Sequence, residues 1–220
     1  MKKAVIFDFN GTLFFDSKKH EQTWNQISLE IRNRDFPYLE IQEKAHGRNN
    51  RQIIDYLSPI QLSEQENLQL SLKKEALYRE LCLNDKEHLH LVNGATSFFD
   101  YLNKNNIPFT IASASIKENI DFFVEVFHLD DYLQRSLIVY NDGRHEDKVA
   151  MFKEASENLK TPIKDCIVFE DSISGINNAF SAGIKDVIVI NEELDISNYQ
   201  DFPIKKFIKD FRFDYDILFK

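Results

Sequence analysis

The chain has 220 residues and carries 36 acidic against 27 basic side chains, which gives a formal net charge of −9. Hydrophobic residues make up 43% of it, enough to bury a core as one large domain or two small ones. With only 6 Gly and 5 Pro, a collagen-like, low-complexity or turn-dense all-β chain is disfavoured. The acidic excess argues against binding to nucleic acid or an anionic membrane and leaves carboxylates for a cation site.

The cysteines and the N-terminus exclude further classes. Cys82 and Cys166 lie far apart without a CxxC pair, so neither a disulfide framework nor a zinc site is expected, and Cys166 is predicted to be buried. The apolar run after Lys3 is too short for a signal peptide, and no stretch is long enough for a membrane span. We therefore expect a cytoplasmic monomer.

Taken in chain order, four short runs predict strands, because each is apolar throughout, as in a parallel sheet covered on both faces. These runs are residues 4–7, 109–112, 166–169 and 187–190. Apolar stripes over 95–102, 116–127 and 173–180 predict helices, with Ser115 as the N-cap of the second and Gly183 at the end of the third. The alternation indicates an α/β fold with a Rossmann-like parallel sheet and helices on both faces.

A helical block interrupts this alternation after the first strand. Segments 17–34, 39–46, 51–57 and 63–83 read as helices, with no strand among them. We predict an inserted α-helical cap domain at 16–90 and an α/β core domain formed by 1–15 and 91–220. In the tail, a short strand at 207–208 and a helix at 215–219 are expected.

The strongest functional signal is the first strand, which ends at Asp8 and is followed at once by Asn10-Gly11-Thr12. Ligands of open parallel sheets bind beyond the carboxyl ends of strands, so Asp8 stands where a nucleophile would be presented. Gly11 would let the backbone turn close to a bound anion. Taken alone, Asp8 is better explained as a residue that closes the strand and bonds the turn amides.

Three further motifs follow in order, and together the four make the chain resemble the haloacid dehalogenase (HAD) superfamily. The resemblance is to the helical-cap branch near β-phosphoglucomutase and related phosphatases. The four segments are Asp8-Phe9-Asn10-Gly11-Thr12, Ile111-Ala112-Ser113-Ala114-Ser115, Glu146-Asp147-Lys148-Val149-Ala150 and Phe169-Glu170-Asp171-Ser172-Ile173. The resemblance covers the whole chain and implies a hydrolase of small phosphorylated metabolites that forms an aspartyl-phosphate on Asp8.

The resemblance also implies a Mg²⁺ cofactor and roles for the matching residues. Asp8, the Asn10 backbone carbonyl and Asp171 would hold Mg²⁺, with Glu170 in support. Lys148 and the Ser113 hydroxyl would hold the phosphate oxygens, together with the Ala114 amide at a helix start. Arg144 and Lys153 are neighbouring alternatives to Lys148.

In the helical block, the segment Gly47-Arg48-Asn49-Asn50-Arg51 resembles the substrate-specificity loop of this branch. Arg48 or Arg51 would then contact the leaving group, although each is equally well explained as a solvated helix residue. The resemblance places His20 near the hinge and the site. Trp24, one helical turn after His20, is expected in the cap core.

The sequence departs from the family at Asn10, where relatives carry a second Asp that protonates the leaving oxygen. A carboxamide cannot shuttle a proton, and loss of a general acid–base typically costs about 10²–10⁴ in rate. Four interpretations stay open: slow turnover or substrates with good leaving groups, a substitute such as His20, a phosphometabolite-binding protein with little turnover, or a trapped variant of an Asp enzyme.

Related branches provide further alternatives. A β-phosphoglucomutase-like phosphomutase depends on the missing Asp and is less favoured. A phosphonoacetaldehyde hydrolase needs a cap lysine near the specificity loop, where only Lys44 is close. A haloacid dehalogenase would carry an aromatic residue at position 10.

Overall fold

The computed structural model describes residues 3–45, 48–193 and 195–219. The chain divides into two compact units, one formed by Met1–Phe15 with His90–Lys220 and the other by Asp16–Leu89. The first unit contains the sheet, and the second is helical in its described residues.

A six-stranded sheet, parallel at every pairing, forms the centre of the first unit, in the order β3-β2-β1-β4-β5-β6. Its strands are β1 (Ala4–Phe7), β2 (Phe109–Ile116), β3 (Val139–Asn141), β4 (Cys166–Glu170), β5 (Asp186–Ile190) and β6 (Lys206–Ile208). The four predicted apolar strands and the tail strand are confirmed, and so is the α/β fold class. β3 was not predicted, because three residues at a sheet edge are too few to give a pattern.

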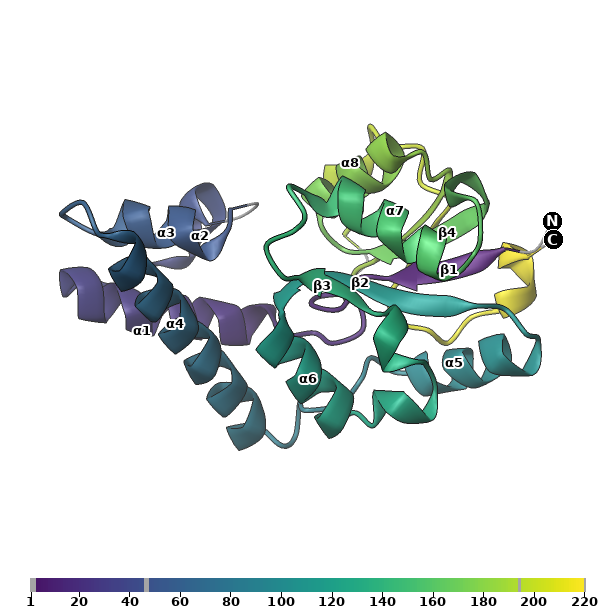
Figure 1. Cartoon of the computed structure of the whole chain (residues 1–220), viewed down its shortest axis with the longest axis horizontal. Helices are drawn as coiled ribbons and strands as arrows, with labels where there is room; N and C mark the ends of the chain where they lie inside the picture. The colour runs from purple at the N-terminus through teal and green to yellow at the C-terminus, as the bar shows by residue number, and fades with distance from the viewer. Residues whose placement is uncertain (1–2, 46–47, 194, 220) are drawn as a thin grey trace. The chain divides into compact units, whose positions relative to one another are not determined.

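Helices cover both faces of this sheet, with α7 and α8 on one face and α5 and α6 on the other (Figure 1). These helices are α5 (Ala95–Lys104), α6 (Lys117–Val126), α7 (Lys148–Asn158) and α8 (Ile173–Ala182). Short 3-10 helices lie at η1 (Leu129–Asp131), η2 (Arg135–Leu137), η3 (Ile163–Asp165), η4 (Ser197–Tyr199) and η5 (Tyr215–Leu218). The predicted terminal helix is thus a single 3-10 turn.

The two faces of the sheet bury different kinds of side chain. On the face of α7 and α8, aliphatic residues such as Ile6 and Val168 pack with Phe152 and Ile176. The other face is aromatic: Phe7 stacks on Phe169 at 5.1 Å between centroids, and Phe98 and Phe99 meet the Phe7 ring edge-on. Because β1 and β4 are packed from both sides, the positions where they end are firmly fixed.

The prediction that Ser115 caps a helix is wrong. Strand β2 continues through Ile116, and α6 begins at Lys117 with no side-chain hydrogen bond at its N-cap. The sequence pattern misplaces this boundary because the last residues of β2 are less buried than its first ones. Their sequence therefore resembles the start of an amphipathic helix rather than a buried strand. By contrast, Gly183 ends α8 at a φ of 98°, as predicted.

The second unit consists of α1 (Ser17–Arg32), α2 (Tyr38–Lys44), α3 (Asn50–Leu57) and α4 (Glu64–Asn84). These four helices agree with the predicted ones to within two residues at each end; His46 and Gly47 lie outside the described residues. Capping boxes begin α3 at Asn49 and α4 at Ser63. Trp24 belongs to the buried core of this unit, which confirms its prediction.

Two smaller expectations concern the cysteines and membranes. Cys82 and Cys166 are both buried free thiols, and burial raises the pKa of each to about 12. In the part of the chain that the structure describes, no helix is long and apolar enough to cross a membrane.

Candidate active site

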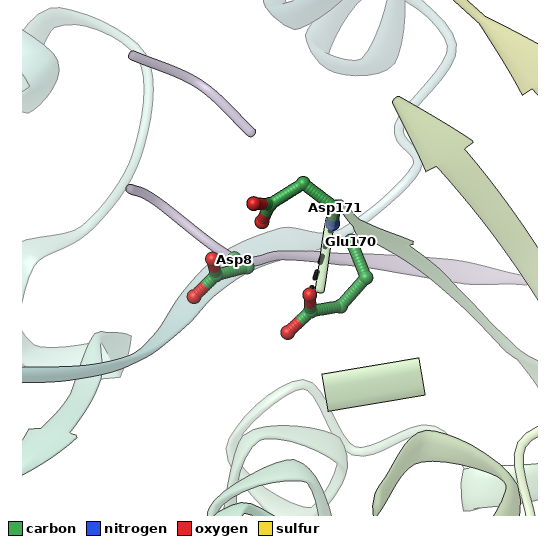
Figure 2. Close-up of side chains that lie close together, drawn as sticks. All are labelled: Asp8, Glu170 and Asp171. Atoms are coloured by element: carbon green, nitrogen blue, oxygen red, sulfur yellow. Dashed lines mark hydrogen bonds between the residues drawn. The ribbon is translucent and has the colours of Figure 1, made fainter. Parts of the chain in front are cut away.

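Three carboxylates meet where β1 and β4 end. These two strands are neighbours, with Phe7 paired to Phe169, so Asp8 follows β1 at the level where Glu170 closes β4 and Asp171 follows it. One oxygen of each carboxylate lies within 4.8 Å of the others (Figure 2). From β1 the strand order continues to β2 and β3 on one side and to β4, β5 and β6 on the other. The site therefore lies at a point where the direction of the strand order reverses, and open α/β sheets bind ligands at such points.

The ammonium group of a lysine lies among these carboxylates. Lys148, the first residue of α7, donates from Nζ to Asp8 Oδ1 at 2.6 Å and also to Glu170 Oε1. Arg144, one alternative to Lys148, pairs instead with Asp142 and Glu154. The structure therefore brings the predicted lysine to the predicted nucleophile, although 140 residues separate them in sequence.

Glu170 and Thr12 fix the turns that carry the other groups. Glu170 Oε2 accepts hydrogen bonds from the backbone amides of Asp171 and Ser172, both at 2.9 Å. Thr12 Oγ1 donates to Asp171 Oδ1 at 3.1 Å. Glu170 is fully buried, and its two oxygens have different partners: one bonds Lys148 and the other bonds the turn that carries Asp171. This side chain therefore fixes the positions of both Lys148 and Asp171.

Two glycines leave room for the carboxylates. At Gly11, where φ is +75°, an added Cβ would stand 2.2 Å from Asp171 Oδ2. At Gly175, in the first turn of α8, it would stand 1.8 Å from Glu170 Oε1. Any larger side chain at either place would have to displace a carboxylate of the site.

Burial is the largest influence on the pKa values of the charged groups in the cluster. Burial raises the pKa of Asp8 to about 7; Lys148 acts against this shift, and Glu170 adds to it. Burial, followed by the charges of Glu170 and Asp8, raises the pKa of Asp171 well above its usual range. Burial disfavours the charged form of Lys148, but Asp8 and Glu170 outweigh it and raise its pKa.

The donor set fits a hard divalent cation. Carboxylate oxygens are the ligands that Mg²⁺ prefers, and the three oxygens of the cluster, which lie within 4.8 Å of one another, could draw closer to the roughly 3–4 Å that separates oxygens on one octahedral Mg²⁺. A bound cation would also stabilise the ionised forms of Asp8 and Asp171, which burial disfavours, as their raised pKa values show.

On the β2 side of the site, Ser113 is buried and Asn10 is half-buried. Ser113 Oγ accepts a hydrogen bond from the Ser115 amide at 3.2 Å, and Asn10 Oδ1 accepts one from Ser115 Oγ at 2.6 Å. Ala114 lies within β2 rather than at a helix start, so that part of its prediction is wrong. The reason is the extension of β2, which moves the helix start to Lys117.

In the helical unit, His20 belongs to a buried polar network that the sequence did not reveal. His20 Nδ1 lies 3.0 Å from Lys74 Nζ and its Nε2 lies 3.2 Å from Asp16 Oδ2, while the ring stacks on Tyr78 at 4.3 Å. Lys74 also donates to Glu75 at 3.0 Å. An ammonium can only donate, so Nδ1 is the acceptor and the ring hydrogen sits on Nε2, toward Asp16.

No sequence signal singled out this network, because Lys74 and Glu75 look like any charged pair on a helix. Both are buried in α4, where Lys74 Nζ also faces the Trp24 ring at 5.3 Å. The two predicted arginines lie on the surface of the same unit: Arg48 is exposed, and exposed Arg51 has Glu64 at 3.5 Å. Contact between either arginine and a substrate stays a prediction.

Comparison with known proteins identifies the family. The family model for haloacid dehalogenase-like hydrolases matches residues 2–183. The crystal structure of a HAD hydrolase, family IA, variant 3, from Entamoeba histolytica is 32% identical with a TM-score of 0.90, over 98% of this chain and 97% of that one. The chain belongs to the haloacid dehalogenase-like hydrolases, as its four motifs predicted.

Two further relatives differ in their named activities. A probable pseudouridine-5′-phosphatase from Drosophila melanogaster is 25% identical over 86% of this chain and 82% of its own length. A β-phosphoglucomutase from Clostridium difficile is 18% identical with a TM-score of 0.81, over 99% and 96% of the two chains, and this likeness shows the fold alone.

Replacing Gly11 tests the close packing against Asp171. Gly11→Ala and Gly143→Ala both place alanine at positive φ, but an added Cβ at Gly143 meets nothing within 4 Å. We expect each to lose about 1–2 kcal/mol of stability, and only Gly11→Ala to weaken Mg²⁺ binding, by about 10–100-fold. Calorimetric titration with Mg²⁺ measures this, and equal affinities in the two variants would contradict the packing argument.

The raised pKa of Asp8 predicts how Mg²⁺ binding depends on pH. With a pKa of about 7, Asp8 is mostly protonated at pH 6 and mostly ionised at pH 8, and a cation binds the ionised form. Mg²⁺ should therefore bind at least about tenfold more tightly at pH 8 than at pH 6. Titrations at both pH values check this, with exposed Asp130→Asn as a control that keeps the difference; an affinity that falls with pH would refute the argument.

Proposed function

We propose that this protein is a Mg²⁺-dependent phosphatase that hydrolyses a small phosphorylated metabolite through an aspartyl-phosphate on Asp8. The observation that carries the proposal is the position of Asp8 at the end of a central strand, bonded to Lys148 beside two further carboxylates. The phosphatase proposal is also supported by the family, whose members are hydrolases. A nucleophile at a strand end and a group of carboxylates suited to a hard cation support it as well.

The chemistry begins at Asp8. A carboxylate oxygen of Asp8 attacks phosphorus, the bond from phosphorus to the leaving oxygen breaks, and water then hydrolyses the aspartyl-phosphate, so that one difficult displacement becomes two easier ones. Asp8, Asp171 and the Asn10 backbone carbonyl would hold Mg²⁺, which when bound neutralises the charge between the phosphate and the carboxylates.

The other residues position the phosphate and its surroundings. Lys148 offers an ammonium next to Asp8, where it can bind a non-transferring phosphate oxygen, and the Ser113 hydroxyl in β2 can bind another. Glu170 keeps Lys148 and the turn of Asp171 in place. Asn10 can donate a hydrogen bond from its carboxamide but cannot transfer a proton at neutral pH.

The relatives support a small phosphate monoester as substrate. The named activity of the Drosophila relative makes pseudouridine 5′-phosphate the first compound to test. We further propose that the helical unit Asp16–Leu89 is the cap expected at 16–90 and carries the determinants of substrate choice.

A phosphometabolite-binding protein with little turnover is the second candidate, and Asn10 is the observation that favours it. In this case the acidic cluster and Lys148 would still bind Mg²⁺ and phosphate, but without an acid to protonate the leaving group most hydrolysis would be prevented. A phosphomutase would need the same missing acid. Phosphate release from a panel of phosphorylated metabolites separates these functions from a phosphatase.

Removal of the nucleophile is the direct test. Phosphate release from p-nitrophenyl phosphate should require Mg²⁺, and Asp8→Asn should lower it by at least about 10³-fold while the fold is kept. The matched change Asp130→Asn, at an exposed site in η1, should leave the rate unchanged. If folded Asp8→Asn protein retained the wild-type rate, the covalent mechanism would be refuted.

Restoring a carboxyl group at position 10 tests the role of the carboxamide. Asn10→Asp should raise hydrolysis of an alkyl phosphate, whose leaving oxygen needs a proton, toward the ~10²–10⁴ range of general acid–base catalysis. The gain on p-nitrophenyl phosphate should be much smaller, because its leaving group departs as a stable anion. A small and equal effect on both substrates, measured as kcat, would mean that another group already handles the proton.

A further inference from the structure

Ser115 makes a contact with Asn10 that the proposed mechanism does not use. Its Oγ donates to Asn10 Oδ1 at 2.6 Å and so joins the end of β2 to the turn that follows β1. Both side chains are half-buried, and hydrogen bonds shielded from water hold their geometry better than exposed ones. The short distance is that of a well-formed hydroxyl hydrogen bond.

An irregularity in β2 accompanies this contact. In the pairing with β3, Ser113 faces Tyr140 while Ile116 faces the next residue, Asn141, so Ala114 and Ser115 are extra in β2. Bulges of this kind often lie beside active sites and redirect a side chain. Ser115 is also placed just before α6 but does not cap it; its hydroxyl is bonded to Asn10 instead.

The contact determines which end of the carboxamide is turned toward Ser115. A carboxamide has an accepting oxygen and a donating nitrogen. With Oδ1 held by the Ser115 hydroxyl, rotation about the last side-chain bond is restricted, and Nδ2 is kept on the side away from Ser115. The group that Asn10 offers on that side is a donor that keeps its proton.

We propose that Ser115 is a positioning residue that holds Asn10 as a hydrogen-bond donor to the leaving oxygen, in a site that has no acid at position 10 and therefore favours phosphates whose leaving group departs as a stable anion. The proposal rests on the phosphatase function and deepens its substrate class: acyl, enol and aryl phosphates should be hydrolysed faster than alkyl phosphates, a class that includes pseudouridine 5′-phosphate. A donor that retains its proton stabilises negative charge on the leaving oxygen but does not neutralise it.

The steps balance without a proton from Asn10. As the bond between an Asp8 oxygen and phosphorus forms, the bond between phosphorus and the leaving oxygen breaks, and that oxygen departs with the electron pair as an anion. The released anion takes up a proton from solvent if the pKa of its conjugate acid lies above the pH. Water then attacks the aspartyl-phosphate, which releases inorganic phosphate and the Asp8 carboxylate, and the water proton passes to phosphate or solvent.

The experiment compares Ser115 variants on substrates that differ in leaving group. Ser115→Ala removes the hydroxyl but keeps the amide that bonds Ser113. We expect kcat/KM to fall about tenfold on phenyl phosphate and glycerol 2-phosphate, and by less than about twofold on acetyl phosphate. An equal loss on all substrates would overturn the proposal, because a general disturbance of the site would not depend on the leaving group.

Further variants test the proposal even if Ser115→Ala is poorly folded. Ser115→Thr retains the hydroxyl and Ser115→Val has the same shape without it, so the threonine variant should behave like wild type and the valine variant like Ser115→Ala. In an Asn10→Ala background, Ser115→Ala should cause no further loss; additive losses would refute action through Asn10. Ser156→Ala, which removes a hydroxyl from α7, should leave every rate unchanged.

Failure of this proposal is distinguishable from failure of the proposed function. If wild-type protein with Mg²⁺ releases no phosphate from any of these compounds, the phosphatase function is wrong and this inference is wrong with it. If release depends on Asp8 but Ser115 variants affect all substrates equally, only the role of Ser115 is refuted.

Discussion

The arrangement of the site depends on the ammonium of Lys148, which is bonded to two of the three carboxylates. Buried charges are unfavourable unless paired, and removing one partner of a buried pair typically costs about 3–5 kcal/mol. Here two carboxylates follow neighbouring strands and cannot move apart, because aliphatic and aromatic layers pack both faces of the sheet. Burial, with the neighbouring charge of Glu170, raises the pKa of Asp8 despite Lys148, and a cation bound here would stabilise the ionised carboxylate.

The second constraint is the carboxamide at position 10. In the turn after β1, Gly11 lies at positive φ against Asp171, and Thr12 is bonded to the same carboxylate. Where the family resemblance implies an acid, position 10 carries a carboxamide, so in the proposed function the site would bind metal and phosphate but would not protonate a leaving group. Substrates with stable leaving anions reconcile an intact binding site with the missing acid.

The helical unit contains its own buried ionic network, in which Lys74 is held by Glu75 and by His20. Both ring nitrogens of His20 have partners in this network, so His20 is ordered by its own unit. For His20 to take over the proton transfer that Asn10 cannot perform, at least one of these contacts would have to break. This cost favours the carboxamide itself as the group that meets the leaving oxygen.

Sequence by itself determined the α/β class, the run of four helices after the first strand, and the two strands at whose ends Asp8 and Glu170 lie. Buried parallel strands are apolar throughout and amphipathic helices repeat every three to four residues, so both patterns are local. Prediction from sequence failed at three places, because none of them has a periodic pattern. β3 is a short edge strand, the end of β2 has an irregular register, and the Lys74 network contains a buried charged pair.

Only the tertiary structure decided which partners the site residues have. That Lys148 rather than Arg144 reaches Asp8, and that Ser115 bonds Asn10 instead of capping α6, follows from contacts across 140 and 105 residues of sequence. Such contacts depend on the order and register of strands β2, β1 and β4, which no local pattern encodes. The motifs thus predicted which residue types gather at the sheet edge, and packing determined what each of them bonds to.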